Sequence, residues 1–449
     1  MRLYDPSNAL GGDSTTDGAD VAIARSLAEL WNAANCWDGG IVKLLSALPQ
    51  APARLTDVAE ELQRFGRLGD LGVTDDGMIV GEATRTERRG RVAIWTGYAI
   101  GAWHPSDIYT QGLGGSETAA WRLSEELADM GWCVTLYGQF DEEGVFGDVI
   151  LRDFRHYDPS VHVDAFVSFR NARVFDSFRP NAGHTFLWLE DLAGPHSEGL
   201  TPGNAKHIDH ICTVSHWHKQ HMLDSYPWLP EPQVVACRNG LDLSFFEAED
   251  IEREKRVVYS SSPDRGLDIL LEIWPRVREA VPDAELISTY SRWYDIVAEH
   301  NPAVAKAREK IISMLDQPGV KRINGGIGQK SLAHLMMSSL VWVHPSWYSL
   351  NDCPMHETSC ISAMEAQAAG CVVVASNWGA LSETVQVGTL VDGDPRIDGP
   401  WRDVFVQSII QGLTDERVQA ASQIAGPESM RDMDWRGAAE QLASLWVAA

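Results

Sequence analysis

The stretch HETSCISAMEAQAAG, residues 356–370, places two glutamates, Glu357 and Glu365, eight positions apart. It precedes the apolar run CVVVA at 371–375, which is typical of a buried strand. Residues 359–369 contain neither glycine nor proline, so we expect a helix there with Ser359 as its N-cap. Since eight residues are slightly more than two helical turns, one carboxylate should precede the helix and the other should lie about two turns along it.

The start of such a helix offers unpaired N–H groups and partial positive charge to a phosphate. With a carboxylate on either side of that start, the segment suits a ligand that carries hydroxyl groups at both ends and phosphates in the middle. A nucleotide sugar has this arrangement.

The composition is that of a globular protein with more than one domain. A chain of 449 residues is long enough for two or three domains, and 44% hydrophobic and 22% charged residues are ordinary values. No apolar run approaches the roughly 18 residues needed to span a bilayer, and the first residues lack the basic and apolar regions of a signal peptide. We therefore expect a cytoplasmic protein without an integral membrane contact.

The cysteines and the net charge indicate which kinds of protein this chain is not. The seven cysteines form no CxxC motif, so reduced core thiols are favoured over disulfides. A formal net charge of −26 disfavours a broad basic face for nucleic acid or anionic lipid, although a local basic groove stays open.

Residues 1–90 are predicted to form a small helical extension, with helices near 21–35, 40–48 and 55–65. The third helix and the turn-rich segment after it also fit a winged helix-turn-helix, so recruitment to nucleic acid stays open. Packing on the next domain is the plainer interpretation.

From residue 91 onward, short apolar strands alternate with helices, which predicts parallel sheets covered by helices. We place a first Rossmann-like unit at 91–232, a second at 233–427, and a final helix that packs back across them at 428–449. Ligands of such doubly wound units bind at the carboxyl ends of the strands, so two facing units should leave a cleft between them.

Two loops that follow predicted strands carry candidate binding residues. Gly114 and Gly115 let the backbone approach a phosphate or sugar without a Cβ in the way, and Ser116 can cap the following helix. A simple turn is the alternative interpretation of this pair. The loop lacks GxGxxG and the chain lacks GxxxxGK[ST], which disfavours nicotinamide dinucleotide enzymes and P-loop NTPases.

In the second unit, Ser261, Ser262 and Arg265 follow the first strand. Arg265 can clamp a diphosphate with forked hydrogen bonds. Lys330 follows another strand and can add a second positive charge, or it can be an ordinary surface lysine.

Two segments invite a metal-site interpretation, and we expect no metal at either. The histidines in KHIDHICTVSHWHKQH, residues 206–221, span a strand and a helix start, so their rings need not converge. The sequence Asp392-Gly393-Asp394 lies in a turn, for which a loop is a sufficient explanation.

The Glu357–Glu365 pair resembles the EX7E signature of the retaining glycosyltransferases of family 4, which have the GT-B fold. Further segments agree in the same order: GGSE at 114–117, VSHWHKQHM at 214–222, RNGLDLSFF at 238–246, and YSSSPDRGLDILLEIWP at 259–275 with PDAEL at 282–286. The SSPDRGL loop resembles one branch of the family. The resemblance covers roughly residues 91–447.

This resemblance implies an enzyme that moves a sugar from a nucleoside-diphosphate donor, of UDP or GDP type, to an acceptor with retention of configuration. Glu357, Arg265 and Lys330 would be catalytic, and Glu365 would hold the ribose hydroxyls. The remaining donor contacts would come from Ser261, Ser262, Gly114, Gly115 and the amides of Ser359, Cys360 and Ile361. No metal or cofactor besides the donor is implied.

Two departures from the family pattern matter. Relatives often carry an arginine and a lysine around the SSSPDRG loop, whereas this chain keeps Arg265 alone, which is why Lys330 is considered as the second cation. Relatives often have His-Asp where this chain has Glu190 and Asp191, which we expect on the acceptor side. Two alternatives remain: a non-catalytic nucleotide-sugar-binding module, and a transferase that acts on nucleic acid or protein recruited by the N-terminal helices.

Overall fold

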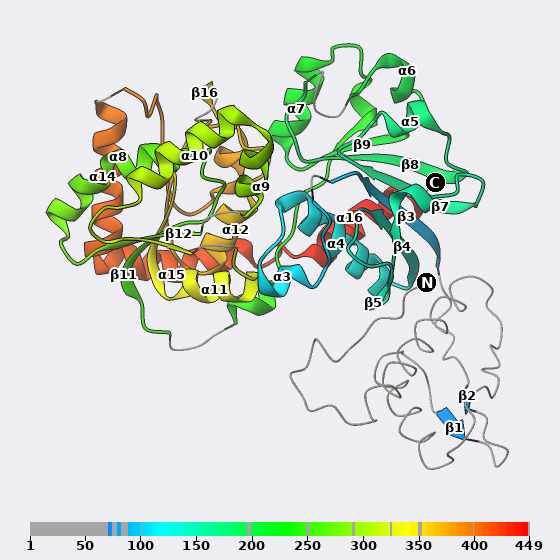
Figure 1. Cartoon of the computed structure of the whole chain (residues 1–449), viewed down its shortest axis with the longest axis horizontal. Coiled ribbons are helices and arrows are strands. Elements are labelled where there is room, and N and C mark those ends of the chain that lie inside the picture. Colours follow the sequence, from blue (N-terminus) through cyan, green and yellow to red (C-terminus); the bar gives the residue numbers. More distant parts are fainter. Residues whose placement is uncertain are drawn as a thin grey trace.

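The computed structural model describes residues 71–73, 79–81, 89–99, 101–194, 199–247, 251–289, 292–323, 326–348, 353–397 and 399–447. The helices predicted within residues 1–90 lie outside these ranges. Among the described residues before the first domain is the antiparallel pair of β1 (Leu71–Val73) and β2 (Ile79–Gly81). The other described residues form two α/β domains side by side (Figure 1).

The first domain is built on an eight-stranded sheet in the order β10-β9-β8-β7-β3-β4-β6-β5. All neighbouring strands are parallel except β5 and β6. The strands are β3 (Gly90–Gly97), β4 (Trp132–Gly138), β5 (Gly144–Phe146), β6 (Val149–Asp153), β7 (Val163–Phe169), β8 (Ala182–Leu189), β9 (His210–Thr213) and β10 (Val234–Ala236). Its helices are α3 (Asp107–Thr110), α4 (Gly115–Asp129), α5 (Val174–Ser177), α6 (Pro202–Ala205) and α7 (His216–Ser225).

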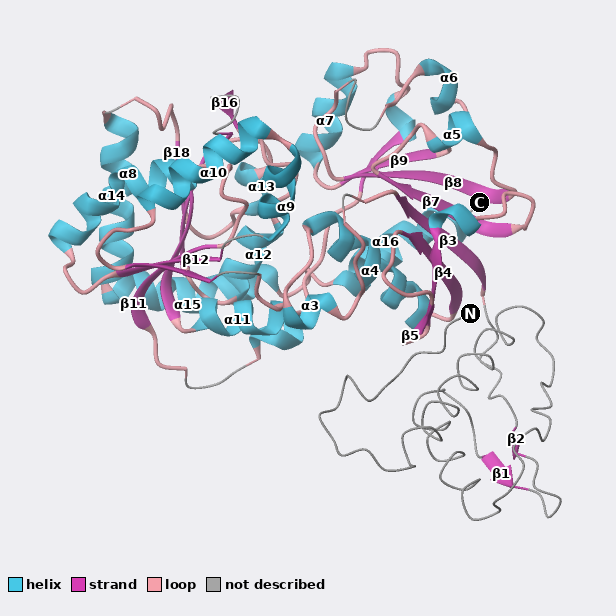
Figure 2. Cartoon of the chain, in the orientation of Figure 1, coloured by secondary structure: helices cyan, strands magenta, loops and turns pink. Residues whose placement is uncertain are grey.

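Both faces of this sheet are buried, as a parallel sheet between helices requires. In the central strand β3, Val92 and Ile94 join one apolar cluster, and Ala93 and Trp95 join another on the opposite face. Successive strand residues point to opposite faces, so this split means that helices and loops cover the sheet on both sides. The predicted doubly wound arrangement is therefore confirmed (Figure 2).

The second domain has a six-stranded sheet, parallel throughout, in the order β13-β12-β11-β14-β17-β18. The strands are β11 (Glu254–Tyr259), β12 (Glu285–Thr289), β13 (Val320–Ile323), β14 (Ser339–His344), β17 (Val372–Ser376) and β18 (Thr389–Val391). The helices are α8 (Leu267–Ala280), α9 (Arg292–His300), α10 (Pro302–Met314), α11 (Gln329–Met337), α12 (Ile361–Ala368), α13 (Leu381–Thr384), α14 (Pro400–Thr414) and α15 (Glu416–Met430). A short hairpin of β15 (Trp347–Tyr348) and β16 (Cys353–Pro354) stands outside this sheet.

The chain crosses between the domains twice. The first crossing follows β10, which pairs with β9 and so extends the first domain beyond the boundary predicted at residue 232. The second crossing lies between α15 and the last helix, α16 (Trp435–Val447). Helix α16 packs in the core of the first domain, where Trp446 meets the rings of Trp132 and Phe186.

The carboxyl ends of both sheets meet at the domain boundary. Ser215, the N-cap of α7 just beyond β9, donates a hydrogen bond to the carbonyl of Thr358 in the second domain at 2.7 Å. Glu190, directly after β8, accepts one from the Thr358 hydroxyl at 2.7 Å. Within the described residues, no helix combines the length and the apolar character needed to cross a bilayer.

Candidate active site

Glu357 lies at the domain boundary and is 5% exposed. Its backbone bridges to Gly379, and its carbonyl accepts a hydrogen bond from the Ala380 amide at 2.7 Å. Its carboxylate oxygen Oε1 accepts a hydrogen bond from His344 Nε2 at 2.9 Å and lies 3.4 Å from Arg265 Nη1. The structure therefore joins the two predicted catalytic residues, Glu357 and Arg265, and adds His344 to them.

The electrostatics of this cluster favour an ionised glutamate. Burial alone raises the pKa of Glu357, but the charge of Arg265 and the hydrogen bond from His344 outweigh it and hold the pKa at about 2. Glu357 is therefore a fixed negative charge across the neutral pH range.

Arg265 is positioned by the loop after β11. The Tyr259 hydroxyl and the Arg265 amide both donate to the carbonyl of Ser262, at 2.7 and 2.9 Å, which closes the loop on itself. The Ser262 hydroxyl donates to the carboxylate of buried Asp264 and is thereby occupied. Ser261 is half-buried and makes no hydrogen bond with another described residue, so of the two predicted serines only its hydroxyl is free for a ligand.

The residue between Arg265 and helix α8 is the N-cap Gly266, and it has to be glycine. Gly266 has φ +98°, and a Cβ built on it would lie 2.3 Å from the carbonyl oxygen of Pro345. The close approach brings the Arg265 loop against the end of β14, where His344 sits. The glycine thus helps to place Arg265 beside Glu357.

The start of α12 differs from the prediction in one respect. The helix begins at Ile361, and Cys360, with φ 69°, occupies the N-cap position without a side-chain cap, so the expectation that Ser359 caps the helix was wrong. The amides of Ser359, Cys360 and Ile361 nevertheless find no hydrogen-bond acceptor among the described residues. Three free N–H groups at a helix start are what an anionic group requires.

Glu365 lies half-buried on α12 with no hydrogen-bond or ion-pair partner in the part of the chain that the structure describes. Burial raises the pKa of its carboxyl to about 7. It shares the wall of a small pocket with residues of both domains, among them Thr118, Asp242, Phe245 and Gln329. Its unmet hydrogen-bonding capacity makes it a candidate acceptor for ligand hydroxyls.

The two glutamates stand on either side of Cys360. After burial, the charges of Glu357 and Glu365 both contribute to raising the pKa of the Cys360 thiol far above its usual range. Glu357 therefore precedes the helix start, while Glu365 lies just over one turn into α12 rather than the two turns expected, because the helix begins at Ile361.

The glycines predicted to face the donor lie at the start of α4. Gly114 is the extended residue before this helix, and Ser116 lies inside the helix, so the prediction that Ser116 caps it was wrong. A Cβ on Gly115 would meet no atom within 4 Å. Gly112, in the same loop, has φ +77°, and a Cβ built on it would lie 2.7 Å from the carbonyl oxygen of Ile327, so this loop touches the second domain.

Glu190 and Asp191 lie at the edge of the first domain that faces Glu357. The Glu190 carboxylate accepts hydrogen bonds from Trp188 Nε1 at 2.7 Å and Asn239 Nδ2 at 3.1 Å, while burial raises its pKa to about 7. Asp191 pairs with Arg170 Nε at 2.5 Å. Arg170 has φ 59°, a backbone conformation that is rare for a long side chain and often marks a functional position.

Lys330 stands apart from this arrangement. It is exposed in the first turn of α11, and within the described ranges it forms no hydrogen bond or ion pair with Arg265 or Glu357. The second cation considered from the sequence is therefore not brought to the cluster in this conformation. His344 is the cluster member that the sequence analysis missed, and its only signal was a polar residue at the end of the apolar strand SLVWVH.

One group in the described residues could hold a metal ion. The ligand atoms of His344, Glu357 and Cys360 lie within 4.8 Å of one another. The Arg265 guanidinium beside the same carboxylate opposes a second positive charge there.

Comparison with known proteins places this geometry in context. Residues 254–415 match the family model described as Glycosyl transferases group 1. Over 184 residues the chain is 28% identical to the MMP alpha-(1->4)-mannosyltransferase of Mycolicibacterium hassiacum, a match that covers 40% of each chain. The chain thus spans less than half the length of the curated relative that it matches.

Solved structures extend the likeness to both domains. The sucrose-phosphate synthase of Thermosynechococcus elongatus superposes with a TM-score of 0.58 at 15% identity, over 80% of this chain and 99% of that one. The HepE protein of Anabaena, in complex with UDP and glucose, superposes with a TM-score of 0.55 at 14% identity, over 80% and 100%. The chain has the GT-B fold. In this GT-B protein, the matched family segment is the second domain, which carries Arg265, Glu357 and Glu365.

Proposed function

We propose that the protein is a retaining glycosyltransferase of family 4 that transfers a sugar from a nucleoside-diphosphate donor to an acceptor. The observation that carries this proposal is the start of α12, where three free amides lie between the ionised Glu357 and the unpaired Glu365. The match of residues 254–415 to glycosyltransferases supports it.

The donor would lie along α12. The diphosphate would accept hydrogen bonds from the amides of residues 359–361, and Arg265 would offset its charge. Glu365 would accept hydrogen bonds from the ribose hydroxyls, which would replace the partners that its carboxylate lacks. Gly115 has open space where a Cβ would be, so the donor would approach the backbone of the first domain there.

The transferred sugar would lie beside Glu357. The acceptor hydroxyl would attack the anomeric carbon from the face that the diphosphate leaves, a diphosphate oxygen would take the proton, and the configuration would be retained. The Glu357 carboxylate, held by His344 and Arg265, would stabilise positive charge that develops on the sugar ring. Because Arg265 and the amides offset the leaving charge, the proposed reaction needs no metal.

The relative's name suggests a first donor to test. A mannosyltransferase is 28% identical over the segment that it shares with this chain, so a mannosyl donor is the leading candidate within the UDP or GDP type. The acceptor would contact the first domain near Glu190 and Asp191. The cytoplasmic location expected from the sequence is part of this proposal.

Donor hydrolysis without acceptor tests the proposal most directly. The purified chain should release free sugar from one nucleotide sugar in a panel of UDP, GDP and ADP sugars, and the matching nucleotide should raise the melting temperature at millimolar concentration. Glu357→Gln should reduce sugar release by roughly a hundredfold or more, as for other removed transition-state contacts. The matched control is Glu279→Gln, an exposed glutamate on α8.

The same assay separates the catalytic proposal from a binding module. Stabilisation by a nucleotide sugar with no release of sugar, in the wild type as in Glu357→Gln, would favour a non-catalytic binder. Absence of both stabilisation and release across the panel would remove the donor site as assigned.

A further inference from the structure

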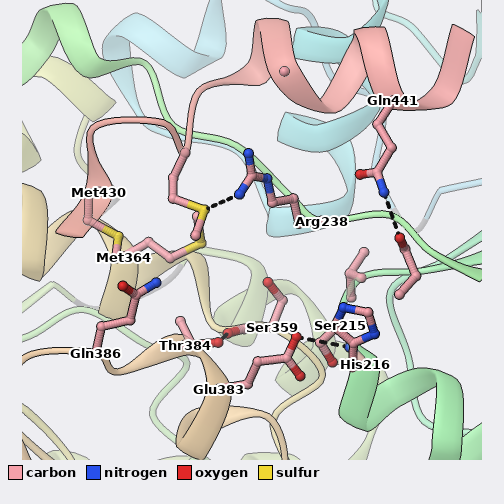
Figure 3. Close-up of a pocket in the computed structure, with 14 residues that line it drawn as sticks. Ser215, His216, Arg238, Ser359, Met364, Glu383, Thr384, Gln386, Met430 and Gln441 are labelled. Atoms are coloured by element: carbon pink, nitrogen blue, oxygen red, sulfur yellow. Dashed lines mark hydrogen bonds between the residues drawn. The ribbon is translucent and has the colours of Figure 1, made fainter. Parts of the chain in front are cut away.

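A cavity of about 470 Å³ lies where the two crossings between the domains meet (Figure 3). We call it the hinge pocket; its walls include Ser215, Arg238, Ser359, Met364, Met430 and Gln441. Arg238 belongs to the first crossing, and Met430 ends the helix before the second. The volume falls in the range of roughly 300–1,000 Å³ that is typical of small-molecule sites.

The hinge pocket is distinct from the pocket that contains Glu365. Met364 and Glu365 are neighbours on α12 but line different cavities. An apolar cluster that joins Leu241, Met364 and Met430 contributes walls to both and lies between them. A ligand in the hinge pocket therefore need not compete with the donor.

The floor of the hinge pocket is apolar and adaptable. Met364 and Met430 are 5% and 1% exposed, and Met433 joins them from the second crossing. Methionine side chains are flexible and polarisable, so such a surface fits apolar groups of different shapes.

One hydroxyl in this wall is not engaged by the protein. Ser359 is 5% exposed, and its Oγ makes no hydrogen bond with any other described residue, although its carbonyl accepts one from the Thr384 hydroxyl. Because Ser359 lines the pocket, its hydroxyl is available to a polar atom of a ligand there.

The pocket also presents a positively charged side chain, that of Arg238. Arg238 donates to the carbonyl of Asp432 at 2.7 Å and contacts Met433 Sδ at 2.9 Å, yet it forms no ion pair in the described part of the chain. The acidic side chain of the pocket, Glu383, is already occupied, because its carboxylate accepts the amides of His216 and Trp217, both at 3.0 Å.

We propose that the hinge pocket binds a small organic anion with an apolar body. The apolar body would lie on Met364, Met430 and Met433, and the anionic group would face Arg238. The Ser359 hydroxyl would bond to a polar atom of the ligand. Since the walls come from both domains and both crossings, the site is complete only when the domains stand as they do here.

Two fluorescent probes that differ in one charged group test the proposal on the full chain. The probe 8-anilinonaphthalene-1-sulfonate carries an anionic group on an apolar ring system, and N-phenyl-1-naphthylamine is its uncharged counterpart. We expect saturable binding of the sulfonate at one site. Arg238→Gln should weaken it roughly tenfold, the scale of a lost charged contact, while Arg238→Lys retains most of it.

Controls assign the effect to the hinge pocket. The uncharged probe should be insensitive to Arg238→Gln, and Arg417→Gln, which removes a 93% exposed arginine side chain, should leave both probes unaffected. If Arg238→Gln binds the sulfonate as tightly as the wild type while it remains folded by circular dichroism, the proposal is overturned.

A second measurement needs no variant at Arg238. In wild-type protein with ¹³C-labelled methionine methyl groups, the sulfonate should shift the signals of Met364, Met430 and Met433 among the 11 methionines. Shifts confined to other methionines would place the probe elsewhere and refute the site. Neither readout depends on sugar transfer, so failure here and failure of the proposed function are separable.

Discussion

The hydroxyl of Thr358 donates a hydrogen bond to the carbonyl of Glu190 across the domain boundary at 2.7 Å. Thr358 follows Glu357 directly, so this bond ties the glutamate of the second domain to the edge of the first. The Thr358 carbonyl in turn accepts a bond from Ser215. The position of Glu357 and the contact between the domains are therefore linked through one residue.

Thr358→Val should loosen this contact while it preserves the shape of the side chain. Loss of one hydrogen bond predicts a decrease of about 0.5–1.5 kcal/mol in the free energy of unfolding, and also a larger radius of gyration in solution scattering. The control is Thr414→Val, whose hydroxyl bonds to the carbonyl of Ile410 within its own helix at 2.7 Å. Equal radii for the two variants would mean that the Thr358 bond does not hold the domains together.

Glu357 should make the protein sensitive to acid. Its folded-state pKa of about 2 lies below the ordinary value of 4.5, so its ionised form stabilises the fold fully above about pH 4.5. This stabilisation is lost as the pH falls toward 2. The difference in unfolding free energy between wild type and Glu357→Gln should therefore shrink from pH 7 to pH 3, as measured by urea denaturation. A difference of the same size at both pH values would argue against the ion pair with Arg265.

Glu365 should have the opposite dependence. Burial raises its pKa to about 7, so the folded state favours the protonated carboxyl, and this contribution to stability is full below about pH 4.5. It is lost as the pH rises through 7. Glu365→Gln should consequently raise the melting temperature, relative to wild type, more at pH 8.5 than at pH 5. An equal change at both values would show that the carboxyl is not desolvated.

Two glycines of the site should respond differently to alanine. Gly266→Ala faces φ +98° and the Pro345 carbonyl oxygen at 2.3 Å, so it should lower the free energy of unfolding by at least about 1 kcal/mol and displace Arg265. Gly115→Ala meets no atom within 4 Å and should leave stability unchanged or raised. If the donor passes Gly115, the same variant should weaken nucleotide-sugar binding in calorimetry; unchanged affinity would place the donor elsewhere.

The parts of the fold that were predictable from sequence are the strands that are buried on both faces of a sheet. The mostly apolar run before Gly138 and the run CVVVA give strands because a parallel sheet that is covered on both faces favours apolar residues at successive positions. The helix that carries Glu365 was also predictable from its apolar composition, although its first residue was not. Short strands such as β10 had too few residues to be recognised without their neighbours.

The details of the site depend on contacts that the local sequence does not contain. Serine is a favoured N-cap, so Ser359 was a reasonable prediction. In the structure, Cys360 takes a left-handed conformation and the Thr384 hydroxyl holds the Ser359 carbonyl, which moves the start of α12 to Ile361. The hydrogen bond from His344 to Glu357 requires β14 to end close to the backbone bridge between Glu357 and Gly379. The order of strands in the sheet sets that position, and the local sequence does not contain it.

The return of α16 to the first domain has a practical consequence for dissecting the protein. Trp435, Leu442 and Trp446 fill the core beneath α4, so a fragment that stops at the first crossing would expose an apolar trough and should aggregate. A recombinant first domain would need α16 fused behind β10 by a short linker. The second domain, whose cores do not include α16, is the better candidate for expression on its own.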